Sequence, residues 1–189
     1  GEVHYSTLSE AVSSATSDST VKLLKNVPLN ESIVVRNQIT LDLNGHQITR
    51  GSGNTQYWLI GVSTSGDLTI LDSQDNGAIQ SGNFQNADGT KPGYGVLTNG
   101  TLTIQSGTIN GYIGVIVSGQ GASAAIHGGT ISAPNSAVQA QLGGAATIDG
   151  GIITGVESGF GVTAIGEYDP NEDNVPTTSI TISGTAKVS

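Results

Sequence analysis

Four aromatic side chains are the residues of this sequence whose chemistry best suits ligand binding. Tyr57 and Trp58 are adjacent and follow polar residues, and Trp58 is the only tryptophan in the chain. Tyr94 and Tyr168 lie in two polar insertions. An exposed aromatic ring offers a flat apolar face to the C–H groups of a sugar, so these four residues are the predicted ligand contacts. The alternative is that the rings pack over the fold, with Trp58 filling a wide part of it.

The second insertion contains an acidic stretch with the spacing of metal ligands. Asp169, Asn171 and Asp173 offer oxygen atoms at alternate positions, as the start of an EF-hand calcium loop does. The sixth position is Asn174 where such a loop has glycine, and the twelfth is Ile180 where it has glutamate. Two interpretations stay open, a calcium site and a plain acidic loop, and no other cofactor is indicated.

The carboxylates elsewhere do not form a recognisable catalytic set. Glycoside hydrolysis needs two carboxylates that face each other across a groove. Asp42, Asp72 and Asp149 each follow an apolar segment, but at different offsets, which is more typical of turn residues that bind their local backbone. The three histidines lack the close spacing of a zinc site. The sequence therefore predicts no catalysis.

The composition limits both the partners and the core. The net charge of −9, with six lysines and arginines in total, argues against a nucleic-acid partner, which would need a basic patch. No apolar run is long enough to cross a membrane. Aromatic residues make up 4% of the chain, so we expect a narrow core of stacked Ile, Leu, Val and Ala. Since the chain has no methionine, we expect a fragment of a larger protein, folded as one domain over residues 1–189.

An internal repeat predicts the fold. Similar segments begin at Leu102, Ala124 and Ala146, which are 22 residues apart (124 − 102 and 146 − 124). Each contains short stretches in which apolar and polar residues alternate, followed by glycine-rich corners. Such repeats predict stacked units, here an all-β parallel β-helix solenoid of about six coils, roughly 30 Å long at the usual strand spacing.

Two segments, 3–16 and 96–104, call for separate predictions. Residues 3–16 carry an apolar stripe and a Thr7–Glu10 capping box, which predicts a helix that covers the first coil, so that 1–18 form the cap and 19–189 the coils. Within 96–104, Asn99–Gly100 resembles a type I′ hairpin turn. An antiparallel sandwich is therefore the alternative fold, although the equivalent positions of the next repeats lack this turn.

The opening helix leads into strands and then into the segment Leu41-Asp-Leu-Asn-Gly-His-Gln-Ile48. Together with the later Ser-Gly-Thr-Ile and Gly-Gly-Thr-Ile steps, it resembles the right-handed parallel β-helix, pectate-lyase-like domains of bacterial cell-surface proteins and adhesins. That resemblance implies a right-handed coil and an extracellular, cell-surface location. Lyases of this fold use clustered aspartates for calcium and an arginine base. Only Arg36 and Arg50 are present, and no dense row of aspartates follows the strands.

These observations together favour a non-catalytic bacterial adhesion or binding module that recognises a glycan or a host surface protein. We expect it to be monomeric within a multidomain surface protein, with the insertions 72–94 and 166–178 on its binding face. Two alternatives stay open. One is a polysaccharide lyase or hydrolase, or the carbohydrate-binding accessory domain of such an enzyme. The other is a structural stalk that binds nothing.

Overall fold

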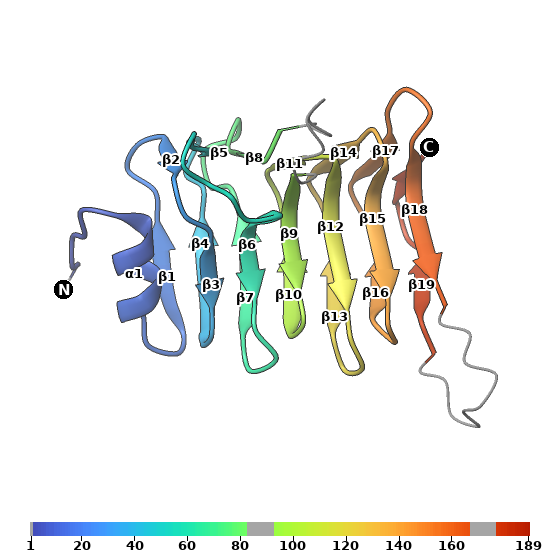
Figure 1. The fold of residues 1–189 in the computed structure, drawn as a ribbon, viewed down its shortest axis with the longest axis horizontal. Coiled ribbons are helices and arrows are strands. Elements are labelled where there is room, and N and C mark those ends of the chain that lie inside the picture. The colour runs from blue at the N-terminus through green and yellow to red at the C-terminus, as the bar shows by residue number, and fades with distance from the viewer. Residues whose placement is uncertain (1, 83–92, 167–176) are drawn as a thin grey trace.

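The computed structural model describes residues 2–82, 93–166 and 177–189. Within these ranges the chain is all-β apart from one short helix, and the strands form three sheets whose neighbours all pair in parallel (Figure 1). The strands of sheet A are β1 (Ser19–Lys22), β4 (Gln38–Asp42), β7 (Asp67–Leu71), β10 (Thr101–Ile104), β13 (Ser123–Ile126), β16 (Ala145–Ile148) and β19 (Ser179–Ile182). Those of sheet B are β2 (Val27–Leu29), β5 (Gln47–Arg50), β8 (Ala78–Gln80), β11 (Thr108–Asn110), β14 (Thr130–Ala133), β17 (Ile152–Gly155) and β20 (Lys187–Val188). Sheet C contains β3 (Ile33–Val35), β6 (Trp58–Val62), β9 (Tyr94–Thr98), β12 (Ile113–Ser118), β15 (Ser136–Gln141) and β18 (Phe160–Ile165).

The order of the strands reflects the repeat in the sequence. Neighbours within a sheet are three strands apart along the chain, so the chain visits sheets A, B and C in the same cycle each time. We call each such group of three strands a coil. Leu102 pairs with Ala124, and Ala124 pairs with Ala146, which confirms that the repeated segments stack in register. This topology is consistent with the parallel β-helix that the repeat predicts.

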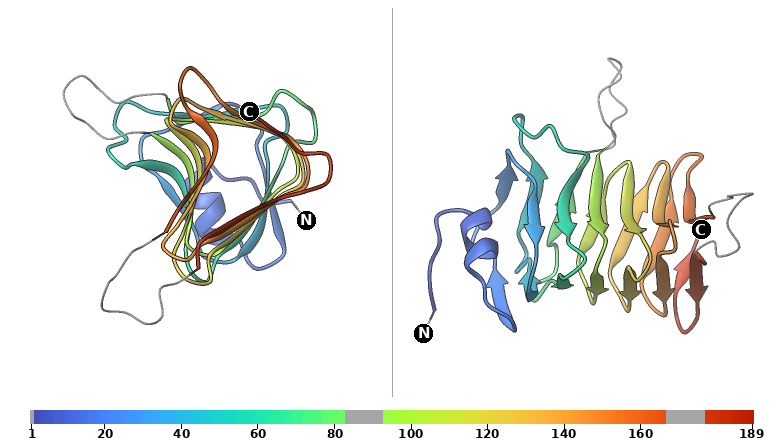
Figure 2. Two further views of the ribbon diagram at one scale, coloured as in Figure 1. Left: turned by 90° about the vertical axis from the view of Figure 1, so that its right-hand side faces the viewer. Right: turned by 60° about the horizontal axis from the view of Figure 1, so that its bottom comes forward.

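The core is a narrow column of packed aliphatic side chains. The three sheets surround it (Figure 2). Successive coils contribute fully buried isoleucines to the same column, for example Ile70, Ile104, Ile126 and Ile148. Each isoleucine packs on its counterpart in the next coil, because parallel pairing in register sets equivalent residues about 4.8 Å apart. The predicted core of stacked aliphatic residues is confirmed.

The hairpin interpretation of residues 96–104 is wrong. The strand β9 belongs to sheet C and β10 to sheet A, and each pairs in parallel with strands of neighbouring coils. Neither Asn99 nor Gly100 has the positive φ that both central residues of a type I′ turn require. This dipeptide therefore forms a corner between two sheets.

The helix α1 (Leu8–Ser14) is shorter than the predicted 3–16. Its start is set by the capping box, in which the Glu10 N–H donates to Thr7 Oγ1 at 3.1 Å and the Thr7 N–H donates to Glu10 Oε2 at 3.2 Å. Leu8 and Val12 are buried, and the helix packs against β3 at the N-terminal end of the stack (Figure 1). In the part of the chain that the structure describes, no helix has the length and apolar character needed to cross a membrane.

Candidate functional site

Three of the four predicted aromatic contacts lie together at the start of adjacent strands in sheet C. Trp58 is the first residue of β6 and pairs with Tyr94, the first residue of β9. Tyr57 precedes Trp58, and its ring stacks on that of Tyr94 with the centroids 6.0 Å apart and the planes 17° apart. Parallel pairing of neighbouring coils thus joins residues that are 36 positions apart in sequence (94 − 58). The fourth residue, Tyr168, lies outside the described residues.

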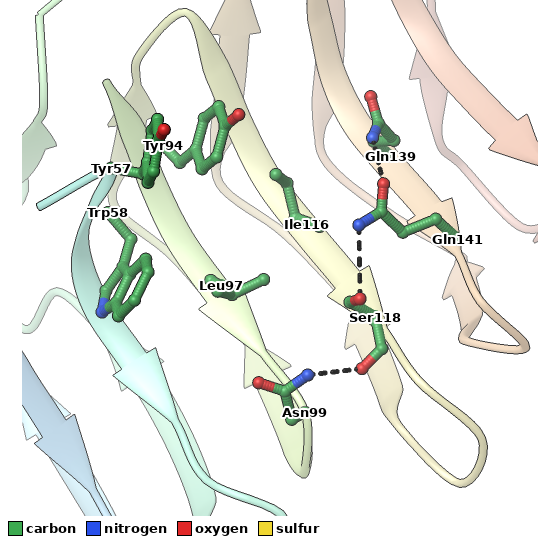
Figure 3. Close-up of a pocket in the computed structure, with 9 residues that line it drawn as sticks. All are labelled: Tyr57, Trp58, Tyr94, Leu97, Asn99, Ile116, Ser118, Gln139 and Gln141. Carbon is green, nitrogen blue, oxygen red and sulfur yellow. Dashed lines mark hydrogen bonds between the residues drawn. The ribbon is translucent and has the colours of Figure 1, made fainter. Parts of the chain in front are cut away.

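A shallow pocket of about 220 Å³ begins at these aromatics and continues over sheet C (Figure 3). Leu97 and Ile116 occupy the middle of the pocket and come from β9 and β12. The polar side chains of the pocket are those of Asn99, Ser118, Gln139 and Gln141. Side chains alternate along a strand, so Leu97 and Asn99 face the pocket while Val96 and Thr98 lie in the core.

Hydrogen bonds link the four polar residues, which we call the amide row. Asn99 Nδ2 donates to the Ser118 carbonyl at 2.7 Å, Gln141 Nε2 to Ser118 Oγ at 3.3 Å, and Gln139 Nε2 to Gln141 Oε1 at 2.7 Å. Gln139 is only 8% exposed and Ser118 only 6%. Among the residues with described positions, nothing donates a hydrogen bond to Asn99 Oδ1 or Gln139 Oε1. The row therefore holds two amide oxygens that accept no hydrogen bond from the described residues.

The pocket lining carries no formal charge at neutral pH, as far as its described residues define it. Burial raises the pKa of the Tyr94 hydroxyl, and the neighbouring Tyr57 and Tyr112 raise it further. Tyr94 is therefore a neutral phenol at pH 7, which can donate or accept a hydrogen bond. The neutrality of the lining contrasts with the net charge of −9 for the whole chain.

Arg50, at the end of β5, fixes the loop that presents the aromatic residues. Its guanidinium donates to backbone carbonyls of Ser81 at 3.0 Å, Gln56 at 2.6 Å and Tyr57 at 3.2 Å. It also donates to Asn54, to Oδ1 at 3.0 Å and to the carbonyl oxygen at 3.4 Å. Burial lowers the pKa of Arg50, yet the group stays charged at neutral pH. The guanidinium thus makes five contacts with oxygens of the protein.

The Trp58 side chain is half-buried, so neither of the two sequence interpretations describes it fully. Its Nε1 is buried without a hydrogen-bond partner among the described residues. The indole lies against Gly61, where an added Cβ would come within 2.9 Å of Nε1. Gly61 pairs with Leu97 of the next coil, so the missing side chain at this position provides the space in which the indole lies.

The remaining sequence candidates lie away from this pocket. Asp42 accepts a hydrogen bond from the backbone N–H of Asn44, and Asp72 accepts one from that of Gly77, which confirms both aspartates as turn residues. Each also accepts a backbone hydrogen bond from a neighbouring coil, Asp42 from Ser73 and Asp72 from Gly45. Asp149 differs, because its Oδ1 lies 2.8 Å from Nδ1 of His127 in the preceding coil.

Metal binding by the second insertion is not tested. Asp169, Asn171 and Asp173 lie outside the described residues, so the calcium site stays a prediction. Across residues 2–82, 93–166 and 177–189, no group of three His, Asp or Glu side chains could hold a metal ion. The first insertion, 72–94, is described over residues 72–82 and 93–94, and Tyr94 at its end lines the pocket.

Sequence reasoning missed Arg50 and the amide row as parts of a site. Aligning the coils would place Leu97, Ile116 and Gln139 at one position of sheet C, since these residues pair in register. Asn99, Ser118 and Gln141 occupy the next outward position, where polar residues recur in three consecutive coils. This recurrence of polar residues is the feature of the sequence from which the amide row could have been predicted.

Comparison of the chain with protein-family models, with curated proteins and with solved structures gives no match.

Proposed function

We propose that this protein is a non-catalytic carbohydrate-binding module that holds a glycan on the outer face of sheet C. The observation that carries the proposal is the convergence of Tyr57, Trp58 and Tyr94 at one end of an uncharged pocket with an amide row. Aromatic faces pack against the C–H groups of sugar rings, while amide and hydroxyl groups bind sugar hydroxyls. Both kinds of contact are available on one surface here.

The chemistry of the pocket supports binding without catalysis. Most glycoside hydrolases work with a pair of carboxylates, one of which protonates the leaving oxygen. The described lining contributes amides, a serine hydroxyl, tyrosines and apolar groups, and no carboxylate or histidine. The nearby cation, Arg50, is engaged with loop oxygens and does not line the pocket.

The proposal extends to the fold family and the location of the protein. We take the three stacked parallel sheets to form a right-handed parallel β-helix of the pectate-lyase-like kind found on bacterial adhesins. The cyclic strand order supports this, and the right hand agrees with the general rule for parallel crossover connections. The module would then act extracellularly, on a bacterial cell surface, as one part of an adhesin.

The test is a binding screen of the wild-type protein on glycan and host-protein arrays, with Trp58→Ala and Tyr94→Ala variants. We expect glycan binding that weakens about tenfold in each variant, since a well-placed aromatic contact contributes about 1.5 kcal/mol. Tyr5→Ala is the matched control, because Tyr5 is an exposed tyrosine that precedes α1 and lies outside the pocket lining. Circular dichroism checks that each variant keeps its sheets.

Three outcomes would contradict the proposal. Silence of the wild type on both arrays would leave the stalk as the better account. Binding to a host protein that Trp58→Ala and Tyr94→Ala leave unchanged would move recognition to another surface. Release of sugar products during the assay would favour the enzyme alternative.

A further inference from the structure

We infer that the ligand of this pocket is an uncharged glycan chain that lies across the strands of sheet C, along the long axis of the stack. This inference rests on the proposed function and adds the class of glycan and its direction across the strands. Three features carry it: the succession of coils that contribute to the pocket, the absence of charge in the lining, and the unused acceptors of the amide row.

The direction follows from the strands that contribute to the pocket. Its lining comes from β6, β9, β12 and β15, which are consecutive neighbours in sheet C. The Trp58 indole lies against Gly61, which is in register with Gln139 through Leu97 and Ile116. Neighbouring strands are about 4.8 Å apart, so the distance from Gly61 on β6 to Gln139 on β15 is roughly 14 Å. A single sugar ring is shorter than this distance, whereas a chain of several sugars can contact both ends. The pocket thus fits an extended ligand perpendicular to the strands (Figure 3).

The charge of the ligand follows from the lining and from Arg50. A carboxylated or sulfated sugar would lose water on binding and would need a cation to offset that loss. The described lining offers no lysine or arginine, and Arg50 lies outside the lining, where its guanidinium makes five hydrogen-bond contacts with other oxygens of the protein. The net charge of −9 would further repel an anionic chain. A neutral glycan meets none of these costs.

The amide row supplies the polar contacts that a neutral glycan needs. Asn99 Oδ1 and Gln139 Oε1 have no donor among the described residues, so both can accept hydrogen bonds from sugar hydroxyls. The Ser118 hydroxyl accepts from Gln141 and keeps its own proton for donation. Because the side chains already hold one another in place, little conformational entropy would be lost when a ligand binds.

The experiment is isothermal titration calorimetry of the wild-type protein with two sets of probes. The neutral set comprises gluco-, xylo-, manno- and galacto-oligosaccharides of one to six residues. The acidic set comprises oligogalacturonates and oligoguluronates of the same lengths. We expect at least one neutral series to bind, with affinity that rises tenfold or more from the monosaccharide to the tetrasaccharide. We expect every acidic probe to bind at least tenfold more weakly than the best neutral tetrasaccharide.

Variants at the two ends of the pocket test the direction. Trp58→Ala removes one end and should weaken every length in the binding series. Gln139→Ala removes the other end and should weaken the tetrasaccharide several-fold while the disaccharide, held at the aromatic end, is unchanged. Melting temperatures of both variants, compared with the wild type, separate loss of contact from loss of fold.

The outcomes distinguish this inference from the proposed function. Acidic probes that bind as tightly as neutral ones, or a monosaccharide that binds as tightly as a tetrasaccharide, would overturn the inference and leave carbohydrate binding intact. Equal effects of Gln139→Ala on the disaccharide and the tetrasaccharide would overturn the direction. Absence of binding to both sets, together with silence on the glycan array, would overturn the proposed function itself.

Discussion

Replacing Arg50 with lysine should loosen the loop that presents Tyr57 and Trp58 while leaving the coils intact. Lysine keeps the positive charge but has a single ammonium group in place of the planar, five-donor guanidinium. The oxygens that Arg50 binds belong to residues on two separate segments, a loop before β6 and the end of β8. One ammonium group cannot reach all of them with good geometry.

The size of the effect can be worked from the contacts. Arg50 makes five hydrogen-bond contacts of 2.6 to 3.4 Å, and a lysine with three N–H groups can replace at most three. Loss of at least two bonds, at a net value of about 1 kcal/mol each, weakens the loop by about 2 kcal/mol. A local opening that is easier by this amount is about 30 times more populated.

Amide hydrogen exchange measures that opening directly. The Tyr94 N–H donates to the Tyr57 carbonyl at 2.6 Å, so its protection reports whether the loop is closed. We expect its exchange to become about 30-fold faster in Arg50→Lys.

Exchange of the Gln105 N–H, which donates to the Ile70 carbonyl at 2.9 Å, should not change. Arg36→Lys is the control, since Arg36 is exposed and makes one long contact, of 3.5 Å, to the Val34 carbonyl. Unchanged Tyr94 exchange in Arg50→Lys would refute the positioning role of Arg50.

Two further predictions concern the stability of the stack. Thr7→Ala removes one half of the capping box and should lower the free energy of unfolding by about 1 kcal/mol, measured as a shift in the urea midpoint. Ser6→Ala is the control and should leave the midpoint unchanged. Equal midpoints in the wild type and both variants would contradict a stabilising cap. Burial by itself raises the pKa of Asp42, but hydrogen bonds from Ser73 and Asn44 and the charge of Lys22 outweigh it, so the folded pKa lies below the usual value. A depressed carboxyl pKa stabilises the fold above the unfolded pKa, and this stabilisation is lost as the pH falls through the folded value. The wild type should therefore lose more stability than Asp42→Asn between about pH 5 and pH 2 in urea titrations, and parallel losses would contradict this account.

The sequence predicts those parts of the fold that repeat from one coil to the next. Parallel pairing in register demands equivalent residues in successive coils, which is why Leu102, Ala124 and Ala146 share a position. The ends and corners follow local rules instead. The helix begins later than predicted because the capping box at Thr7 fixes its first turn. Asn99–Gly100 resembles a hairpin turn because hairpin turns and the corners between sheets favour the same residue types.

The candidate site was predictable only where residue type alone is informative. Tyr57 and Trp58 stand out by composition, but the pairing of Trp58 with Tyr94 depends on a coil enlarged by an insertion, so a period of 22 does not reveal it. The amide row was also hidden from a search for a fixed period. Asn99, Ser118 and Gln141 are separated by 19 and 23 residues (118 − 99 and 141 − 118), because corners of different length lie between them. The partners of Arg50 are mainly backbone carbonyls, which a residue pattern does not show.

Under the proposed function, stability and recognition depend on opposite faces of the same strands. Val96, Val115 and Val138 occupy one buried column of sheet C, and a polar substitution there would disturb the core. The outward neighbours of these valines change from one coil to the next without any change of register, from Leu97 to Gln139. In β18, Gln141 of the amide row pairs with the exposed Ile165, and Gln139 pairs with Thr163, which lies outside the pocket lining. With Trp58 at one end and Ile165 beyond the other, the row has a fixed length. The affinity for neutral oligosaccharides should therefore stop rising once the chain spans the four contributing strands.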